Sequence, residues 1–241
     1  EEHGDQWALS ADTYMGNGPF KMKEIGGREY IAEKADTYWD KENIFWEEII
    51  YRTIENALTE DSAFRTGGLD VTEDVAVPEI DYWKQQDAYR VQPLFATYYV
   101  SFNLKEPPFD DVNVRKAFSR AIDRKLITSR VTKRNEPVSG GIVPANLNSA
   151  RGGTYGEARG DLIGEMDMEE AKTLLENSEY GTDLPPIEYL YNTDDVNKAI
   201  GEQLQFMWKQ IADVDVRLQQ VEWGTFMNRA YNGDYMACRS S

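Results

Sequence analysis

The feature that most constrains the fold is a strand–helix–strand pattern in the last quarter of the chain. The segment "PIEYLYN", residues 186–192, has the apolar and aromatic content of a strand. A helix pattern follows from Asp195, and "DVDVRLQQV" then alternates apolar and polar residues as a half-buried strand does. The apolar face of the helix pattern carries Val196, Ile200, Leu204, Trp208 and Ile211. Units of this kind predict an α/β lobe whose sheet is at least partly parallel.

The first part of the chain also mixes strand and helix patterns. The segment "GPFKMKEIGGREYIAEK" predicts a β-hairpin that turns at Gly26–Gly27. The β-rich run "EEIIYRTI" follows, and a short helix through Ala63 and Phe64 is expected to end at Gly67–Gly68.

Strand patterns continue beyond that helix. We expect a strand at residues 69–71 and a helix that opens at Pro78. The segments "YRVQPLF" and "TYYVSFNL" have the composition of strands. The alternation of strands and helices is thus maintained up to residue 104.

The stretch "PPFDDVNVRKAFSRAIDRK" predicts a capped amphipathic helix. Asp111 is the expected cap, and a second aspartate, Asp123, can cap a new helix after it. The long Gly-, Asn- and Pro-rich segment "VSGGIVPANLNSARGGTYGEARGD" reads as irregular. Asp167 with Glu170 forms a capping-box pattern for a helix that we expect to end at Gly181. Nothing in the stretch "PPFDDVNVRKAFSRAIDRK" is chemically reactive, whereas long loops such as the irregular segment often touch ligand.

Composition excludes several classes of function. The formal net charge of -17 disfavours binding to nucleic acid or to anionic lipids, and a solvated acidic surface is its simplest explanation. With one histidine, His3, and one cysteine, Cys238, a His/Cys zinc site, a Cys-His nucleophile pair and an internal disulfide are not expected. No apolar run is long enough to cross a bilayer. Because the chain opens at Glu1 without a signal peptide, we expect it to be a piece of a longer protein.

Seven segments in order carry a resemblance to a known family. They are "NGPFKMKE", "ADTYWDK", "FRTGGLDV", "TYYVSFNLKEPPFDDVNVRKAFSRAIDRK", "EEAKTLLENSEYG", "IEYLYNTDD" and "WKQIADVDVRLQQVEWGTF". Together they resemble the extracellular oligopeptide-binding proteins of ABC transporters, the peptide/nickel solute-binding family 5. The resemblance covers nearly all of the chain. It implies an α/β fold of the type II periplasmic-binding-protein kind, with partial lobes whose mixed sheets are joined by a crossover.

The resemblance also implies how the chain is divided between two lobes and what the intact protein does. Residues 1–95 would form part of the first lobe, and residues 96–241 would form part of the second lobe, which the family completes further along the chain. Such a protein is not an enzyme and needs no cofactor. It captures an oligopeptide between its lobes and delivers it to the permease subunits of an importer, either at the outer face of the cell membrane, held by a lipid anchor, or in the periplasm.

Site residues are carried over from the family one position at a time. Tyr99 falls where a family tyrosine faces the ligand, and Trp223 matches a tryptophan that lines a side-chain pocket. Arg239 aligns with an arginine near the cleft. Asn197 stands where some relatives carry a histidine that meets the peptide C-terminus, and a neutral amide cannot supply that charge. For Tyr99 and Trp223 a place in the core remains an alternative.

Glu73 and Asp74 follow the "GGLDV" segment, whose strand pattern makes them candidate ligand-edge residues, because ligands bind at the carboxyl ends of strands in α/β sheets. A solvated loop is the alternative for both.

Two other functions remain open at this stage. The same fold in relatives binds nickel chelates, haem or short sugars, although one histidine makes bare transition-metal binding unpromising. A carboxylate-dependent glycoside hydrolase would use paired acids, and adjacent acids usually point apart. The pairs in question are Glu47–Glu48, Asp110–Asp111 and Asp194–Asp195.

Overall fold

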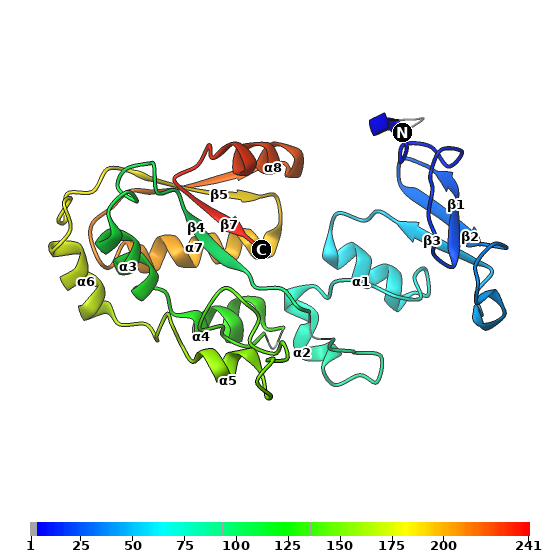
Figure 1. The fold of residues 1–241 in the computed structure, drawn as a ribbon, viewed down its shortest axis with the longest axis horizontal. Helices are drawn as coiled ribbons and strands as arrows, with labels where there is room; N and C mark the ends of the chain where they lie inside the picture. The colour runs from blue at the N-terminus through cyan, green and yellow to red at the C-terminus, as the bar shows by residue number, and fades with distance from the viewer. Residues whose placement is uncertain (1–3, 93, 135) are drawn as a thin grey trace. The chain divides into compact units, whose positions relative to one another are not determined.

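A computed structural model describes residues 4–92, 94–134 and 136–241 (Figure 1). The chain divides into two compact units, Glu1–Ala76 and Val77–Ser241. His3 lies outside the described residues, as does Pro93 within the "YRVQPLF" segment. The assignment of residues 1–95 and 96–241 to two lobes stays a prediction.

The first unit is built on an antiparallel sheet of three strands in the order β1-β2-β3. The predicted hairpin is confirmed: Phe20 pairs with Lys34 and Met22 with Ala32, and a bulge then shifts the register so that Glu24 faces Ile31. The elements of this unit are η1 (Gly4–Gln6), β1 (Phe20–Ile25), β2 (Glu29–Lys34), η2 (Lys41–Asn43), β3 (Glu48–Arg52) and α1 (Ala57–Arg65).

Local hydrogen bonds define both ends of α1. The Asn56 side chain accepts a hydrogen bond from the Thr59 amide at 3.0 Å and caps the first turn. The chain then turns at Gly67, whose φ is +78°, and the Gly68 amide donates to the carbonyl of Ala63 at 2.7 Å. The predicted stop at Gly67–Gly68 is therefore confirmed.

The strand expected at residues 69–71 is wrong. That segment has no strand partner, because the sheet of this unit ends with β3, and Val71 is exposed. β propensity alone does not make a strand, since a strand needs a neighbour to satisfy its main-chain groups.

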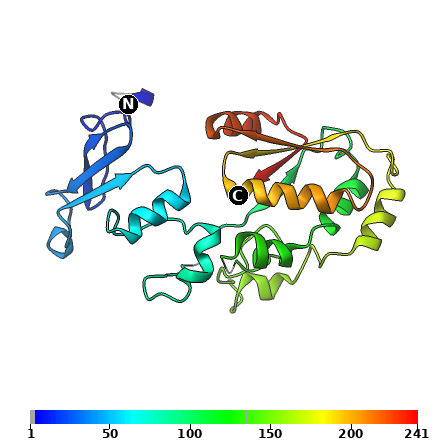
Figure 2. The same ribbon diagram turned by 180° about the vertical axis from the view of Figure 1, so that it is seen from behind.

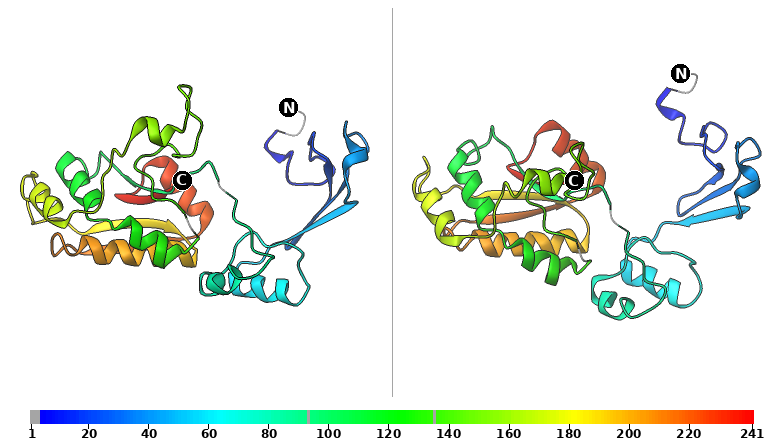
Figure 3. Two further views of the ribbon diagram at one scale, coloured as in Figure 1. Left: turned by 90° about the horizontal axis from the view of Figure 1, so that it is seen from below. Right: turned by 60° about the horizontal axis from the view of Figure 1, so that its bottom comes forward.

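The second unit contains a mixed sheet in the order β4-β7-β5-β6. β5 runs parallel to both β6 and β7, and β4 runs antiparallel to β7, which confirms the predicted partly parallel α/β sheet. Figure 3 shows β7, in red, among strands from distant parts of the chain. The elements are η3 (Val77–Glu79), α2 (Ile80–Trp83), β4 (Tyr99–Phe102), α3 (Val112–Arg120), α4 (Arg124–Leu126), η4 (Ile127–Thr132), α5 (Tyr155–Arg159), α6 (Met168–Glu176), β5 (Ile187–Asn192), α7 (Asp195–Trp208), β6 (Val216–Val221), α8 (Trp223–Asn232) and β7 (Ala237–Ser240).

Helices cover both faces of this sheet, with α7 on one side and α8 on the other (Figures 1 and 2). On the α7 face, Tyr189 and Tyr191 of β5 pack in the main core together with Trp208. On the α8 face, Leu190 packs with Phe226 and Cys238. The alternation along β5 sends neighbouring side chains to opposite faces, so one strand anchors both layers.

The predicted helix start at Asp111 is confirmed. Its side chain accepts a hydrogen bond from the Asn113 amide at 2.6 Å, and the apolar stripe of α3 is buried in the main core. Asp123 caps the next helix by accepting from the Leu126 amide at 2.9 Å. Beyond it the helix widens, because Ile127–Thr132 forms a π-helix that the sequence pattern did not indicate.

Three further expectations need correction. The described residues of "YRVQPLF" form no strand. The irregular segment contains a short helix, α5, which starts with a complete capping box between Thr154 and Glu157. Asp167 caps α6 as expected, but Glu170 pairs with Arg120 at 2.8 Å, and α6 ends at Glu176, before Gly181. In the second case a local cap outweighed the pattern, and in the third Glu170 took a tertiary partner.

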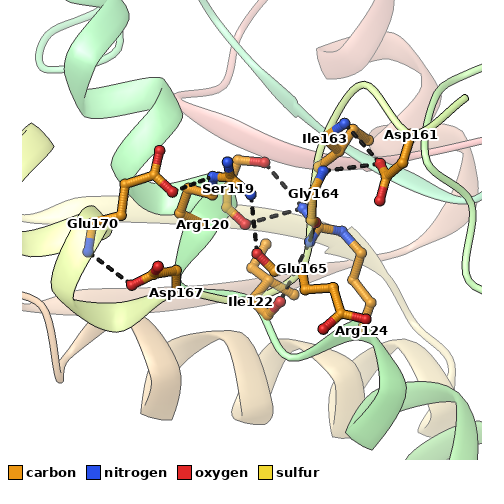
Figure 4. A network of polar contacts seen from close by, with 10 residues as sticks. All are labelled: Ser119, Arg120, Ile122, Arg124, Asp161, Ile163, Gly164, Glu165, Asp167 and Glu170. Atoms are coloured by element: carbon orange, nitrogen blue, oxygen red, sulfur yellow. Dashed lines mark hydrogen bonds and ion pairs between the residues drawn. The ribbon is translucent and has the colours of Figure 1, made fainter.

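Arg120 and Arg124 fasten the loop that precedes α6 to the junction of α3 and α4 (Figure 4). The Arg120 Nη1 donates to the carbonyl of Glu165 at 3.1 Å. The Arg124 Nη1 donates to the carbonyl of Gly164 in the loop at 3.4 Å, and its Nη2 donates to the carbonyl oxygen and the Oγ of Ser119 in α3, both at 3.0 Å. The two guanidinium groups thereby satisfy main-chain acceptors of a segment that has little secondary structure of its own.

No helix within the described ranges is both long and apolar enough to span a bilayer.

Replacing Gly164 with alanine is expected to lower the melting temperature of the protein. Gly164 has φ +76°, and a Cβ there would collide with the Arg120 Nη1. Gly233→Ala is the control, because its φ of +73° and ψ of 23° are left-handed helical and a Cβ there meets no atom within 4 Å. The control should lose about 1 kcal/mol from left-handed strain alone, and Gly164→Ala about 2 to 4 kcal/mol, measured by urea unfolding. Equal losses in both variants would contradict the collision.

Asp111→Ala is expected to destabilise the protein only above acidic pH. The Glu179 amide donates to Asp111 at 2.7 Å, and this bond, ahead of the Asn113 and Val114 amides and the charge of Arg115, lowers the pKa of Asp111 against a smaller opposing effect of burial. Because the folded pKa is depressed, the stabilisation is complete above about pH 4 and is lost as pH falls through the lowered pKa. Wild type and variant should differ by about 1 kcal/mol at pH 7 and converge at lower pH in urea titrations. A pH-independent difference would exclude the carboxylate as its source.

Candidate functional site

The second sheet gathers several candidate residues along one edge. β5, β6 and β7 are parallel in pairs, so their carboxyl ends lie on the same side of the sheet. β4 is antiparallel to β7, and Tyr99, its first residue, is therefore paired with Ser240 near the end of β7. The first turns of α7 and α8 follow directly from the ends of β5 and β6. In α/β sheets this carboxyl edge is the usual place for a ligand.

Arg239 is the centre of an aromatic cluster at this edge. Its guanidinium carbon lies 5.2 Å from the ring centroid of Tyr98 and 5.8 Å from those of Trp223 and Phe226. These distances allow cation–π attraction. The Arg239 Nε is buried and has no hydrogen-bond partner within the described part of the chain. A buried cationic donor in this state can donate a hydrogen bond to a carboxylate ligand.

Trp223 is the first residue of α8 and presents its indole to solvent, with 51% of its surface exposed. The helix begins here because the Glu222 side chain accepts hydrogen bonds from the Gly224 and Thr225 amides, at 2.8 and 3.3 Å. The indole stacks on Phe226, with ring centroids 5.7 Å apart and an interplanar angle of 25°. A half-exposed ring supported from beneath is suited to contact an apolar side chain.

Asn197 lies in the first turn of α7, and its side chain is already engaged. Its Nδ2 donates to the Oδ1 of Asn192 at 3.1 Å, and its amide donates to the Asp194 cap at 2.7 Å. Asn197 therefore presents a neutral group at the sheet edge, and it has no charge with which to meet a carboxylate.

Tyr98 and Phe226 belong to the Arg239 cluster, but the sequence analysis did not single them out. Phe226 lies three residues after Trp223, which places both on one side of a helix. Tyr98 is exposed and directly precedes β4. The helical spacing was a usable signal for Phe226, whereas the proximity of Tyr98 to Arg239 follows only from the antiparallel β4–β7 pairing.

Glu73 and Asp74 are not part of this edge, because they lie in the first unit, where no strand precedes them. The Glu73 amide donates to the Glu60 carboxylate at 3.2 Å. Burial raises the pKa of Glu60, the hydrogen bond from Glu73 opposes the shift, and the charges of Asp74 and Glu73 add to it. Both residues are exposed, and their expected position after a strand is corrected here.

Across residues 4–92, 94–134 and 136–241, no group of three or more His, Cys, Asp and Glu side chains is arranged to hold a metal ion.

Comparison with known families identifies the chain. Residues 1–241 match the family described as bacterial extracellular solute-binding proteins, family 5 Middle. The chain belongs to this family. Family 5 binding proteins matched in sequence include the dipeptide-binding protein DppE of Bacillus subtilis, 34% identical over 94% of this chain and 42% of its own length. The oligopeptide-binding protein OppA of the same organism is 32% identical over 99% of this chain and 45% of its own length.

Solved structures agree with this family assignment. An oligopeptide-binding protein, OppAIV, from Borrelia burgdorferi has a TM-score of 0.85 at 29% identity and covers 99% of this chain and 47% of its own. OppA of Haemophilus influenzae in complex with RPPGFSPFR has a TM-score of 0.80 at 26% identity, with 99% and 48% covered. The predicted family and fold class are confirmed. The chain spans less than half the length of these relatives.

Trp223→Ala should leave this family 5 chain folded, because half of the indole is already exposed. We expect a loss below about 1 kcal/mol for Trp223→Ala and about 3 to 5 kcal/mol for Phe226→Ala, whose ring is only 3% exposed. Chemical unfolding of the two variants side by side is the measurement. A larger loss for Trp223→Ala than for Phe226→Ala would assign Trp223 to the core.

Proposed function

We propose that this chain belongs to the solute-binding component of an ABC importer that captures oligopeptides in a cleft between two lobes of the intact protein. The Arg239 cluster is the observation that carries the proposal. It combines a buried cationic donor with the exposed rings of Tyr98 and Trp223 at the carboxyl edge of a sheet. A peptide offers matching groups, because it has a carboxylate at one end and side chains along an extended backbone.

The proposed mechanism is recognition followed by release, without a chemical reaction. Main-chain hydrogen bonds hold the peptide in an extended form, and the rings of Trp223 and Tyr99 contact side chains. Arg239 meets the terminal carboxylate, and the neutral Asn197 shifts the choice of peptide length away from ligands that need a cation there. The names of the DppE and OppA relatives, and the peptide in the H. influenzae complex, support this choice of ligand.

The partners and location are part of the same proposal. The intact protein delivers peptide to permease subunits, and it works either at the outer face of the cell membrane through a lipid anchor or in the periplasm. The family description is extracellular, and the related OppA of Escherichia coli is named as periplasmic, which supports a place outside the cytoplasm. The two lobes are proposed to contain residues 1–95 and 96–241.

A second candidate keeps the fold and changes the solute. One relative from E. coli, 28% identical over 100% of this chain, is named as a probable deoxycholate-binding periplasmic protein. Such an amphiphile also carries a carboxylate and an apolar body, so Arg239 and Trp223 suit it chemically. For nickel chelates, haem and oligosaccharides, only the shared fold of relatives that bind them supports binding by this protein.

Titration calorimetry of the intact protein with a panel of di- to octapeptides tests the proposal. Trp223→Ala and Arg239→Met should each weaken peptide binding by about 10- to 100-fold, because both remove central contacts. Amidating the peptide C-terminus should weaken peptide binding by the wild-type protein in the same range. It should not weaken binding by Arg239→Met further, since the two changes remove the same interaction.

Phe206→Ala is the control, because Phe206 is an exposed aromatic residue of the same unit on α7. The peptide affinity of Phe206→Ala should equal that of the wild-type protein. Absence of heat with every peptide, together with saturable binding of deoxycholate, would replace the peptide proposal by the second candidate.

A further inference from the structure

Arg229 makes several polar contacts at the C-terminal end of α8. The Arg229 Nη2 pairs with the Glu188 carboxylate of β5 at 2.7 Å, and the Arg229 Nε donates to the carbonyl oxygen and the carboxylate of Asp234 at 3.1 and 3.0 Å. The side chains of Arg229 and Glu188 are only 23% and 29% exposed. Ion pairs that are partly shielded from water hold their geometry better than surface pairs.

Main-chain bonds close the same end of the helix. Gly233 has φ +73°, its amide donates to the Ala230 carbonyl, and the Asp234 amide donates to the Arg229 carbonyl at 2.9 Å. This is the paired bonding of a Schellman cap. From the other side, the Asn103 Nδ2 donates to the carbonyls of Gly233 and Tyr235, both at 3.0 Å. The turn from α8 into β7 is therefore fixed to its surroundings.

The N-terminal end of α8, where Trp223 lies, has fewer polar restraints. Trp223 stacks on Phe226 and faces Arg239, while Phe226 lies in the small core with Leu190 and Cys238. Arg229 is three residues after Phe226, so the two share the side of the helix that meets the sheet. Six residues separate Trp223 from Arg229, or about 9 Å along the axis. A tilt of the helix at Arg229 thus displaces Trp223.

We propose that Arg229 is a positioning residue: by pairing with Glu188 and Asp234 it sets the tilt of α8 and so holds Trp223 over Phe226 beside Arg239. Its relevance to affinity rests on the proposed peptide-binding function. Lysine cannot replace it fully, because a single ammonium lacks the planar fork that reaches two acceptors in different directions. Burial by itself lowers the pKa of Arg229, and the bonds and charges of Glu188 and Asp234 outweigh that effect and raise it.

The test compares Arg229→Met with a matched control in the intact protein. Arg120→Met removes another partly shielded arginine of the same unit, whose pair with Glu170 has side chains 28% and 41% exposed and lies on α3 and α6. Arg229→Lys and Glu188→Gln are milder variants, which keep the measurement possible if Arg229→Met does not fold. The melting temperature of every variant is recorded beside its binding.

The first readout needs no ligand. Emission and iodide quenching of Trp223 are obtained by subtracting the Trp223→Phe spectrum in each background, because the chain has six tryptophans. Arg229→Met should change the quenching of Trp223 by about twofold, Arg229→Lys should restore part of the wild-type value, and Arg120→Met should leave it unchanged. Wild-type quenching of Trp223 in folded Arg229→Met or Glu188→Gln would overturn the proposal.

The second readout is peptide affinity. Arg229→Met should raise the peptide Kd by about tenfold, while Arg120→Met lowers the melting temperature comparably without changing the Kd. If wild type binds no peptide but the quenching differs as expected, the positioning role stands and the peptide proposal fails. If the wild-type protein binds peptide and Arg229→Met and Arg120→Met weaken that binding equally, Arg229 acts only through overall stability. The positioning role is then excluded.

Discussion

The second unit depends on one buried side chain, Trp208 at the end of α7. Its indole N–H donates to the carbonyl of Phe118 at 3.0 Å, so a polar group that burial would otherwise leave unsatisfied joins α7 to α3. Its rings pack against Phe118 at 5.2 Å and edge-on to Tyr189 at 5.9 Å. Helix α3, the central strand β5 and the helix that follows that strand, α7, are thereby joined to each other.

The first unit is organised in a different way. Its buried apolar side chains within the described residues are Ala32, Ala35 and Ala76, which are too small to form an extensive core. Large aromatic side chains such as Trp39 and Phe45 are exposed. Strand pairing and side-chain caps, rather than apolar burial, therefore define the shape of this unit, and the short-range sequence signals for its hairpin and helix were correspondingly reliable.

The candidate site shows how a sheet topology creates chemistry that no segment holds alone. Trp223 comes from the start of α8, Arg239 from β7 and Tyr98 from the residue before β4, and they meet because β7 lies between β4 and β5. Sequence resemblance supplied Trp223 and Arg239, but it gave no reason to choose Tyr98. The expectation of a strand before Glu73 and Asp74 suggested these two residues, but they lie in the first unit and no strand precedes them.

The sequence by itself determined the local elements whose signals are short-range. The caps at Asp111, Asp123 and Asp167, the Gly26–Gly27 turn and the apolar face of α7 each depend on residues within a few positions of one another. Only the tertiary structure decided which strands pair, that Glu170 bonds to Arg120 instead of closing a capping box, and that Tyr98 lies over Arg239. The physical reason is range: a cap or a turn satisfies its hydrogen bonds within one segment, whereas a strand edge or a buried cation takes its partner from whichever distant segment the packed core brings to it.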